Sequence, residues 1–142
     1  MRRRKSGKYR NLGILFMRTG LGILFILKGY PTVFGGPEAW ESYGEMMQYV
    51  GIEFAPMFFG FIIAIIEFFG GIFLILGLFF TPTLISLILV MIVLVVKEIL
   101  IGGGFALLSN PIMLAIIFFS LLFIGPGQQS LDNYLKSRRR LY

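Results

Sequence analysis

Four apolar runs, each long enough to cross a lipid bilayer, constrain the fold of this chain more than any other feature. They cover roughly residues 12–30, 55–80, 83–101 and 105–125. The hydrocarbon core of a bilayer is ~30 Å thick, and an α-helix needs about 20 apolar residues to span it. Because backbone polar groups in lipid must be hydrogen-bonded internally, these runs are predicted to be helices. The expected fold is an all-α integral membrane four-helix bundle.

Composition supports a membrane protein and excludes several kinds of site. The 142 residues are 57% hydrophobic and 14% charged, whereas a soluble domain carries roughly a quarter charged residues. The length suits one domain, so we expect a single transmembrane domain over residues 1–142. The chain has no Cys and no His, which excludes disulfides, thiolate or imidazole metal ligands, haem held by His, and catalysis by a thiol or a histidine base. We therefore expect no metal site.

The distribution of charge predicts the orientation in the membrane. Six of the 13 Lys and Arg residues lie in the first ten positions and four more lie in residues 136–142, so the segments 1–11 and 128–142 are basic. The connection 31–54 carries four Glu and no Lys or Arg. Basic flanks stay in the cytoplasm, so both termini are predicted to be cytoplasmic and this connection is predicted to be external. The basic segments should attract anionic lipids, which explains them without a nucleic-acid partner.

The external connection is predicted to contain a short amphipathic helix over residues 37–50. Pro37 follows two glycines and suits the first position of a helix. At 100° per residue, the apolar and polar side chains separate onto two faces, one with Trp40, Tyr43, Met47 and Val50 and the other with Glu38, Glu41, Glu45 and Gln48. Such a helix either lies on the membrane surface or packs as a lid over the mouth of the bundle. Both alternatives are open at this stage, and both close the external end.

Glu67 is the one charged residue in the otherwise apolar stretch IIAIIEFFGGIFLILGLFF, residues 62–80. Counted along the helices, Glu67 and Arg18 lie about 12 Å and about 9 Å above the cytoplasmic edge. Both lie on strips of small residues, where helices approach closely; the packing glycines are Gly22, Gly29, Gly60, Gly70 and Gly71. Since an unpaired charge at this depth is costly, we predict that Arg18 and Glu67 face each other as the polar centre. The pair is either purely structural or functional.

A second set of charges lies nearer the external side. Lys28 and Lys97 are predicted about 6 Å and about 9 Å from the outer boundary. Glu98 adjoins Lys97, and Glu53 lies in the loop above. These four residues trace an outer polar path, or a set of ligand contacts, that leads down to Glu67. The alternative is that the two lysines only extend their amines to the interface.

Three motifs resemble those of the DoxX family of small membrane proteins. They are RTGLGILFILKG in the first helix (residues 18–29), EFFGGIFLILGLFFTP in the second (67–82) and GPGQQSLD near the end (125–132). In the closing motif the matching residues are Gly125, Pro126, Gly127, Ser130, Leu131 and Asp132, and Ser130 is also a predicted helix cap. The resemblance implies a four-helix inner-membrane protein. It also implies relatives such as the DoxD-type subunit of thiosulfate:quinone oxidoreductase and proteins linked to oxidative and thiol stress.

Three functions are compatible with the sequence. The first, which the resemblance implies, is a subunit or accessory of a membrane redox system in which the bundle binds a quinone. Arg18 or Lys28 would donate hydrogen bonds to the quinone carbonyls and Glu67 would pass protons. Because the chain has no redox side chain, this function requires a protein partner.

The second function is a small proton-coupled transporter that uses Glu67 and acts as a homo-oligomer. The charge of Arg18 argues against it, because it would compete with a cationic substrate. The third function is a non-catalytic membrane scaffold in which every charge is structural. Whether the protein is an enzyme stays open at this point.

Overall fold

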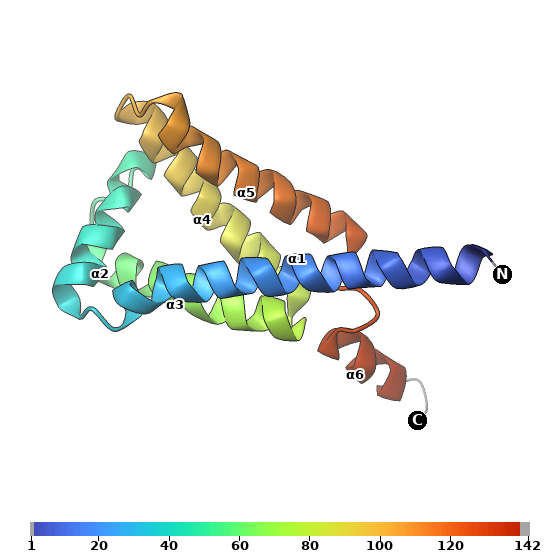
Figure 1. Cartoon of the computed structure of the whole chain (residues 1–142). Helices are drawn as coiled ribbons and strands as arrows, with labels where there is room; N and C mark the ends of the chain where they lie inside the picture. Colours follow the sequence, from blue (N-terminus) through green and yellow to red (C-terminus); the bar gives the residue numbers. More distant parts are fainter. Residues whose placement is uncertain (1, 140–142) are drawn as a thin grey trace.

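The computed structural model describes residues 2–139, and within that range it consists of helices joined by turns and loops (Figure 1). The order is α1 (Arg2–Val33), α2 (Pro37–Gly44), the 3₁₀-helix η1 (Glu45–Val50), α3 (Pro56–Leu76), α4 (Phe80–Leu100), α5 (Phe105–Ile124) and α6 (Leu131–Arg139). Four of them, α1, α3, α4 and α5, are long and apolar enough to cross a membrane. The predicted all-α fold with four membrane helices is confirmed.

The two ends of the bundle are occupied by different elements. Figure 1 shows the start of α1 and the helix α6 at one end, called here the α6 end. It shows α2, η1 and the α4–α5 connection at the other end, called here the α2 end. Of the predicted basic segments, residues 1 and 140–142 and the side chains of residues 2–6 and 138–139 lie outside the described part of the chain. The cytoplasmic location of the α6 end stays a prediction from charge.

Glycines bring α1 and α3 side by side (Figure 1). A Cβ atom on Gly22 would lie 2.5 Å from the carbonyl oxygen of Gly71, and one on Gly71 would lie 2.6 Å from that of Gly22. A Cβ atom on Gly29 would lie 2.7 Å from the backbone nitrogen of Phe68. Any side chain at these positions would push the helices apart, so the glycines permit the close approach. These contacts set the register of α1 against α3.

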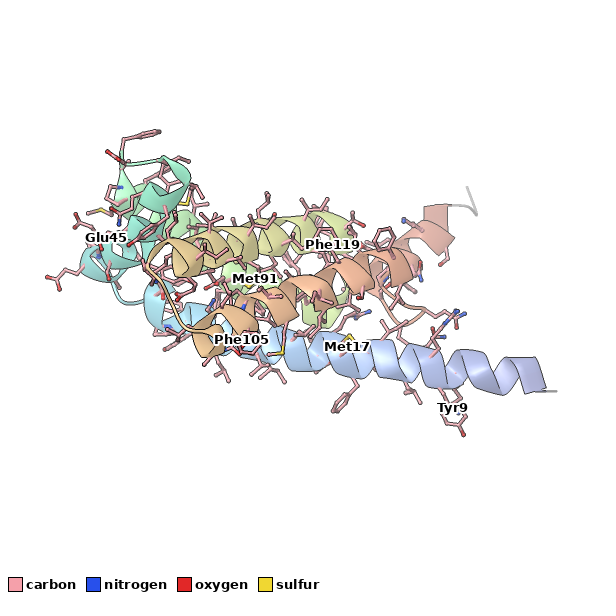
Figure 2. All side chains as sticks on the ribbon, turned by 90° about the horizontal axis from the view of Figure 1, so that it is seen from above. Tyr9, Met17, Glu45, Met91, Phe105 and Phe119 are labelled. Carbon is pink, nitrogen blue, oxygen red and sulfur yellow. The ribbon has the colours of Figure 1, made fainter. Side chains whose placement is uncertain are left out.

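The core of the bundle lies between these two helices and the pair formed by α4 and α5. Its fully buried side chains from α4 and α5 are Phe80, Leu84, Leu87, Met91, Phe118 and Leu121. Phe25 of α1 packs against Phe118, with the ring centroids 5.3 Å apart. Figure 2 shows Met91 among the helices and Tyr9 of α1 pointing away from them. The exposed apolar side chains on the outside of the bundle form the surface that a lipid environment requires.

The helix α2 packs closely on α3, and its position relative to a membrane surface stays a prediction. A Cβ atom on Gly60 would collide with the carbonyl of Trp40, and one on Gly44 would collide with that of Pro56. The indole of Trp40 also packs on Phe61, with the ring centroids 4.6 Å apart. The connection is not one α-helix over 37–50, because its second half is the 3₁₀-helix η1.

The turn between α3 and α4 comes earlier than predicted. We expected the second helix to continue to residue 80 and the third to begin at residue 83, but the chain turns at Gly77. Gly77 has a φ of 64°, its N–H donates to Leu74 O at 3.2 Å, and the N–H of Leu78 donates to Phe73 O at 3.0 Å. This pair of bonds is the Schellman ending of a helix, for which glycine is favoured. Pro82 lies in the first turn of α4, where its missing N–H removes no helical hydrogen bond.

Candidate functional site

Glu67 of α3 forms the polar centre of the bundle together with Lys28 of α1 and Tyr43 of α2. Its side chain is fully buried, at 0% exposure. Lys28 Nζ donates to Glu67 Oε1 at 2.7 Å, and Tyr43 Oη donates to Glu67 Oε2 at 2.8 Å. The side chain of Lys28 is 42% exposed. The carboxylate is therefore neutralised by one partner and hydrogen-bonded by both, which is how a buried charge becomes tolerable.

Close backbone contacts bring both partners to Glu67. Lys28 precedes Gly29, and Glu67 precedes Phe68, so the Gly29–Phe68 contact places the lysine and the glutamate at one level. Tyr43 precedes Gly44, whose contact with Pro56 holds α2 on α3. Tyr43 was not predicted as a polar partner, because its position in the sequence placed it on the apolar face of the helix expected over residues 37–50. The sequence feature that could have indicated this role is that Tyr43 directly precedes Gly44, a residue small enough to allow close packing of α2 on α3.

The predicted pair between Arg18 and Glu67 is wrong. Arg18 is buried, at 1% exposure, but its guanidinium donates to three backbone carbonyls. Arg18 Nε donates to Leu74 O and Nη2 to Ile75 O, both at 2.9 Å, and Nη1 donates to Pro126 O. The last carbonyls of a helix carry the negative end of the helix dipole, and Leu74 O accepts from Arg18 in addition to Gly77 N. Arg18 therefore stabilises the end of α3.

The error came from the depth assigned to the first helix. The prediction took Leu12 as the cytoplasmic boundary, whereas α1 begins ten residues earlier, at Arg2, and ends at Val33. In the structure the residue level with the end of α3 is Arg18, and Glu67 lies about two turns, or about 12 Å, further along α3. A boundary misplaced by roughly six residues moves a side chain by about 9 Å. That is enough to exchange Arg18 for Lys28 as the partner of Glu67.

The closing motif packs on the same turn as Arg18. Asp132 accepts hydrogen bonds from the backbone N–H groups of Phe79 at 3.1 Å and Phe80 at 2.9 Å, so it caps the start of α4. Ser130 is buried and accepts from Asn133 N at 3.3 Å, which makes it the cap of α6. The motif also supplies the Pro126 carbonyl to Arg18. Arg18 and Asp132 thus bracket the α3–α4 turn with opposite charges at the helix ends that favour them.

The glycines of the closing motif serve its turns. Gly125 and Gly127 have φ values of 83° and 76°, a conformation that other residues rarely adopt. They let the chain leave α5 and fold back beneath the bundle. Together with Arg18, the motif has a structural role at the α6 end.

A cavity of about 520 Å³ lies between α1, α4 and α5, and we call it the Lys28 cavity. Its walls are mainly apolar, with Leu24, Met91 and Leu114 among them. Its polar side chains are Lys28, Glu98 and Asn110. Apolar walls with a few converging polar groups are typical of sites for small, largely apolar ligands. The structure thus brings Lys28 and Glu98, two of the predicted outer contacts, into one cavity and adds Asn110.

A second, more polar cavity of about 270 Å³ lies where η1 and α2 meet α4, and we call it the Tyr43 cavity. Tyr43, Glu45 and Lys97 are among its lining residues. Lys97 also lies 3.7 Å from Glu98, measured from Nζ to Oε1. Glu53, the remaining member of the predicted path, is exposed and lines a separate hollow of about 170 Å³. Three of the four residues of the predicted path thus line these two cavities, and Glu53 lies apart.

The hydroxyl of Tyr43 is held in its protonated form. Burial, followed by the charge of Glu67 and the hydrogen bond to it, raises the pKa of Tyr43 well above its ordinary value. An anionic phenolate beside a buried carboxylate would be strongly disfavoured. Tyr43 therefore stays a hydrogen-bond donor to Glu67 over the physiological pH range.

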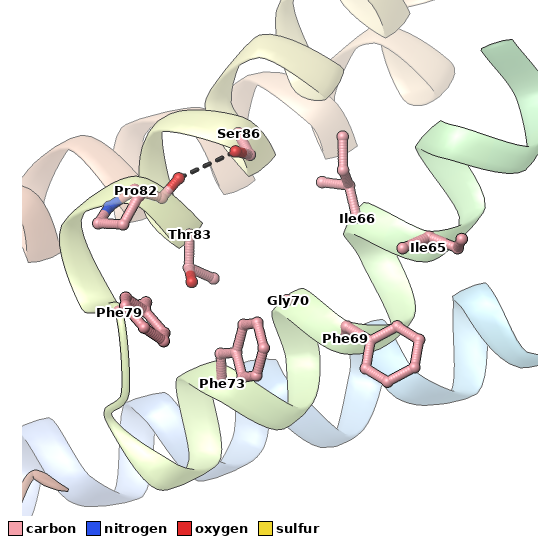
Figure 3. A pocket seen from close by; sticks show the side chains of 9 residues that line it. All are labelled: Ile65, Ile66, Phe69, Gly70, Phe73, Phe79, Pro82, Thr83 and Ser86. Carbon is pink, nitrogen blue, oxygen red and sulfur yellow. Dashed lines mark hydrogen bonds between the residues drawn. The ribbon is translucent and has the colours of Figure 1, made fainter.

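An apolar groove lies on the face of α3 that points away from Glu67, and it differs from the two cavities in having no charged side chain. It has a volume of about 370 Å³ and lies between α3 and α4, with Phe69, Phe73 and Phe79 along it (Figure 3). Its polar side chains are those of Thr83 and Ser86, and Ser86 Oγ already donates to Pro82 O at 2.9 Å. Gly70 lies in this groove and not at the α1–α3 contact. The groove has no charged group and suits lipid chains.

Comparisons with known proteins support the sequence resemblance. A family model described as DoxX matches residues 13–98, which is more than half of the chain and runs from α1 into α4. Lys28, Tyr43, Glu67 and Glu98 all lie inside the matched range, and the closing motif lies outside it. No curated protein and no solved structure matches the chain. Among residues 2–139 there is also no group of three or more acidic, His or Cys side chains that could hold a metal ion.

Proposed function

The chain belongs to the DoxX family of membrane proteins, and on this premise we propose that it is a subunit or accessory of a membrane redox system that binds a quinone-like lipid in the Lys28 cavity. The observation that carries the proposal is the chain of hydrogen bonds from Tyr43 through Glu67 to Lys28. Its two ends line two different cavities. A fully buried carboxylate therefore connects a polar cavity at the α2 end with a mainly apolar cavity between α1, α4 and α5.

Each part of this chain has a chemical use in quinone binding. Quinone carbonyls accept hydrogen bonds, and the ammonium of Lys28 has donors only. Reduction of a quinone to a hydroquinone consumes two electrons and two protons, and Glu67 is placed to hand protons from the Tyr43 side to the Lys28 side. Ionisable residues inside a membrane protein commonly mark such proton relays. The sequence offered Arg18 or Lys28 as the hydrogen-bond donor to the quinone. Because the guanidinium of Arg18 is bound to three backbone carbonyls, we assign this role to Lys28.

The electrons must come from outside the chain, because it has no cysteine and no metal site among the described residues. We therefore include a protein partner in the proposal, as the donor of electrons within a membrane complex. The location that fits is the plasma (inner) membrane, with the basic α6 end in the cytoplasm near anionic lipids. The Tyr43 cavity would then face the external side.

The test is quinone binding by the purified full-length protein. We expect quinone to co-purify with the wild-type protein, and to be lost from Glu67→Gln and from Lys28→Met, which removes the ammonium and keeps most of the side-chain length. The matched control is Lys8→Met on an exposed face of the same helix, which should retain the quinone. Absence of quinone from the wild-type protein, in membranes that contain it, would contradict the proposal.

The same variants distinguish the two other functions. Proton flux in liposomes that depends on a cationic substrate and on Glu67 would indicate a transporter instead. The fixed ammonium of Lys28 beside Glu67 argues against cation exchange, because it occupies the place that a cationic substrate would take. A loss of thermal stability in Glu67→Gln, with neither quinone binding nor flux in the wild-type protein, would indicate a scaffold.

A further inference from the structure

Glu98 lies on the wall of the Lys28 cavity, and its carboxylate makes no hydrogen bond within residues 2–139. It lies in the last turn of α4, and its side chain is 13% exposed. Its nearest cation is Lys97, at 3.7 Å from Oε1, which is beyond hydrogen-bond distance. The other oxygen, Oε2, is buried and has no hydrogen-bond partner among the described residues. A buried carboxylate in this condition is destabilising unless some other group donates to it.

The two charged side chains of the cavity, Lys28 and Glu98, therefore have opposite character, while its third polar side chain, Asn110, is neutral. Lys28 donates hydrogen bonds and accepts none, and a carboxylate accepts them and donates none. A ligand that satisfies both must carry an acceptor for Lys28 and a donor for Glu98. A quinone has hydrogen-bond acceptors only, so its carbonyl oxygen would be repelled by the lone pairs of the Glu98 carboxylate. A hydroquinone carries hydroxyl groups, each of which both donates and accepts.

We infer that the Lys28 cavity binds the reduced, hydroxyl-bearing form of its ring ligand more tightly than the oxidised form, with the carboxylate of Glu98 accepting the O–H. This inference rests on the proposed function, since it specifies the redox state that the proposed quinone site prefers. It gives Glu98 a role that neither the polar centre nor the family match assigns. Tighter binding of the reduced form makes the bound quinone a stronger oxidant toward the partner that supplies electrons, by about 30 mV for each tenfold preference.

The experiment measures the affinity of the full-length protein, in lipid nanodiscs under argon, for a decyl-substituted benzoquinone and for its hydroquinone. In the wild-type protein we expect the hydroquinone to bind at least about tenfold more tightly, the effect of one hydrogen bond to a charged acceptor. Glu98→Gln should reduce this preference to about twofold or less, because an amide can also donate to a carbonyl. The control Glu53→Gln, at an exposed glutamate of the α2 end, should keep the wild-type preference.

Each alternative result has a definite meaning. Equal affinities of the wild-type protein for the two forms, with binding lost in Lys28→Met, would overturn the role of Glu98 and leave the proposed function standing. Binding of neither form would overturn both. If Glu98→Gln does not fold, the reduction potential of the quinone bound to the wild-type protein is compared with that of the same quinone free in the nanodisc lipid. A bound potential higher by about 30 mV or more supports the inference. An equal or lower bound potential overturns it.

Discussion

Lys28 Nζ and Glu67 Oε1 lie 2.7 Å apart in an ion pair whose two members have different surroundings. The glutamate is fully buried in α3, while the lysine is 42% exposed toward the cavity that carries its name. Glu67 therefore depends on its partners for stabilisation more than Lys28 does, because a lysine without a partner can extend toward a polar surface. This asymmetry leads to the first prediction.

Lys28→Met should destabilise the protein, because it leaves a buried carboxylate without a counter-charge. We expect the free energy of unfolding to fall by about 2–3 kcal/mol. Adding Glu67→Gln to Lys28→Met should recover part of this loss, since the buried charge is then removed. Thermal or denaturant unfolding in detergent measures both changes. Additive effects of the two substitutions would show that the pair is not coupled.

Arg18→Lys should destabilise the protein although it keeps the charge. A lysine amine cannot reproduce the three separate contacts of the guanidinium with Leu74, Ile75 and Pro126. Losing two hydrogen bonds to a charged donor should lower the free energy of unfolding by about 3 kcal/mol. The control is Arg10→Lys at an exposed position of the same helix, for which the melting temperature should not change. Loss of quinone binding by a folded Arg18→Lys protein would contradict the structural role of Arg18.

Asp132→Asn should weaken the connection of α6 to the bundle. The two N–H groups of Phe79 and Phe80 bind different oxygens of Asp132, and in asparagine one of these oxygens becomes an NH₂ group, which donates and cannot accept. The amide also lacks the charge that favours a helix start. We expect a loss of about 1 kcal/mol and faster proteolysis after Gly127. Gln129→Ala, an exposed residue of the same segment, is the control. Unchanged proteolysis in Asp132→Asn would contradict the capping role.

Gly22→Ala and Gly20→Ala form a matched pair on α1. A Cβ on Gly22 would lie 2.5 Å from Gly71 O, while a Cβ on Gly20 would meet nothing within 4 Å. Gly22→Ala should therefore separate α1 from α3 and lower stability by about 1–3 kcal/mol. Gly20→Ala should be neutral or stabilise the helix by up to about 1 kcal/mol. Equal effects in unfolding experiments would mean that the α1–α3 contact is not as close as described.

Tyr43→Phe should change how stability depends on pH in the alkaline range. The pKa of Tyr43 is raised in the folded state, so the folded protein holds this proton more firmly than the unfolded chain. The stabilisation is complete below the ordinary tyrosine pKa of about 10 and is lost as the pH rises above it, by up to about 1.4 kcal/mol per pH unit. Tyr43→Phe should have a shallower slope above that pH. Tyr9→Phe, at an exposed position, controls for general effects of alkali; equal slopes in all three proteins would refute the assignment.

Much of the architecture could be predicted from the sequence because it follows from local rules. Apolar runs of sufficient length must be helices in lipid, and a lone glutamate in such a run must find a partner. Glu67 was therefore recognisable as the polar centre, and the glycine strip with Gly22, Gly29 and Gly71 was recognisable as the place of closest helix contact. Helical periodicity carries this information within one segment.

The partners of Glu67 could not be predicted in the same way. Lys28 lies beside the glycine strip of α1 and not on it, and its flexible side chain carries the amine to a place that periodicity does not specify. Tyr43 reaches Glu67 because α2 folds back onto α3 at Gly44 and Gly60. That contact depends on the shapes of two segments together.

By itself the sequence determined four membrane helices and one buried carboxylate that needed neutralising. Only the tertiary structure decided that Lys28 and Tyr43 neutralise it, that Arg18 instead serves the end of α3, and that Glu98 shares a cavity with Lys28. The physical reason is that helix formation depends on neighbours along the chain, while the sliding of one helix past another depends on backbone contacts between them. A shift of less than two turns along α1 changes which charge meets Glu67.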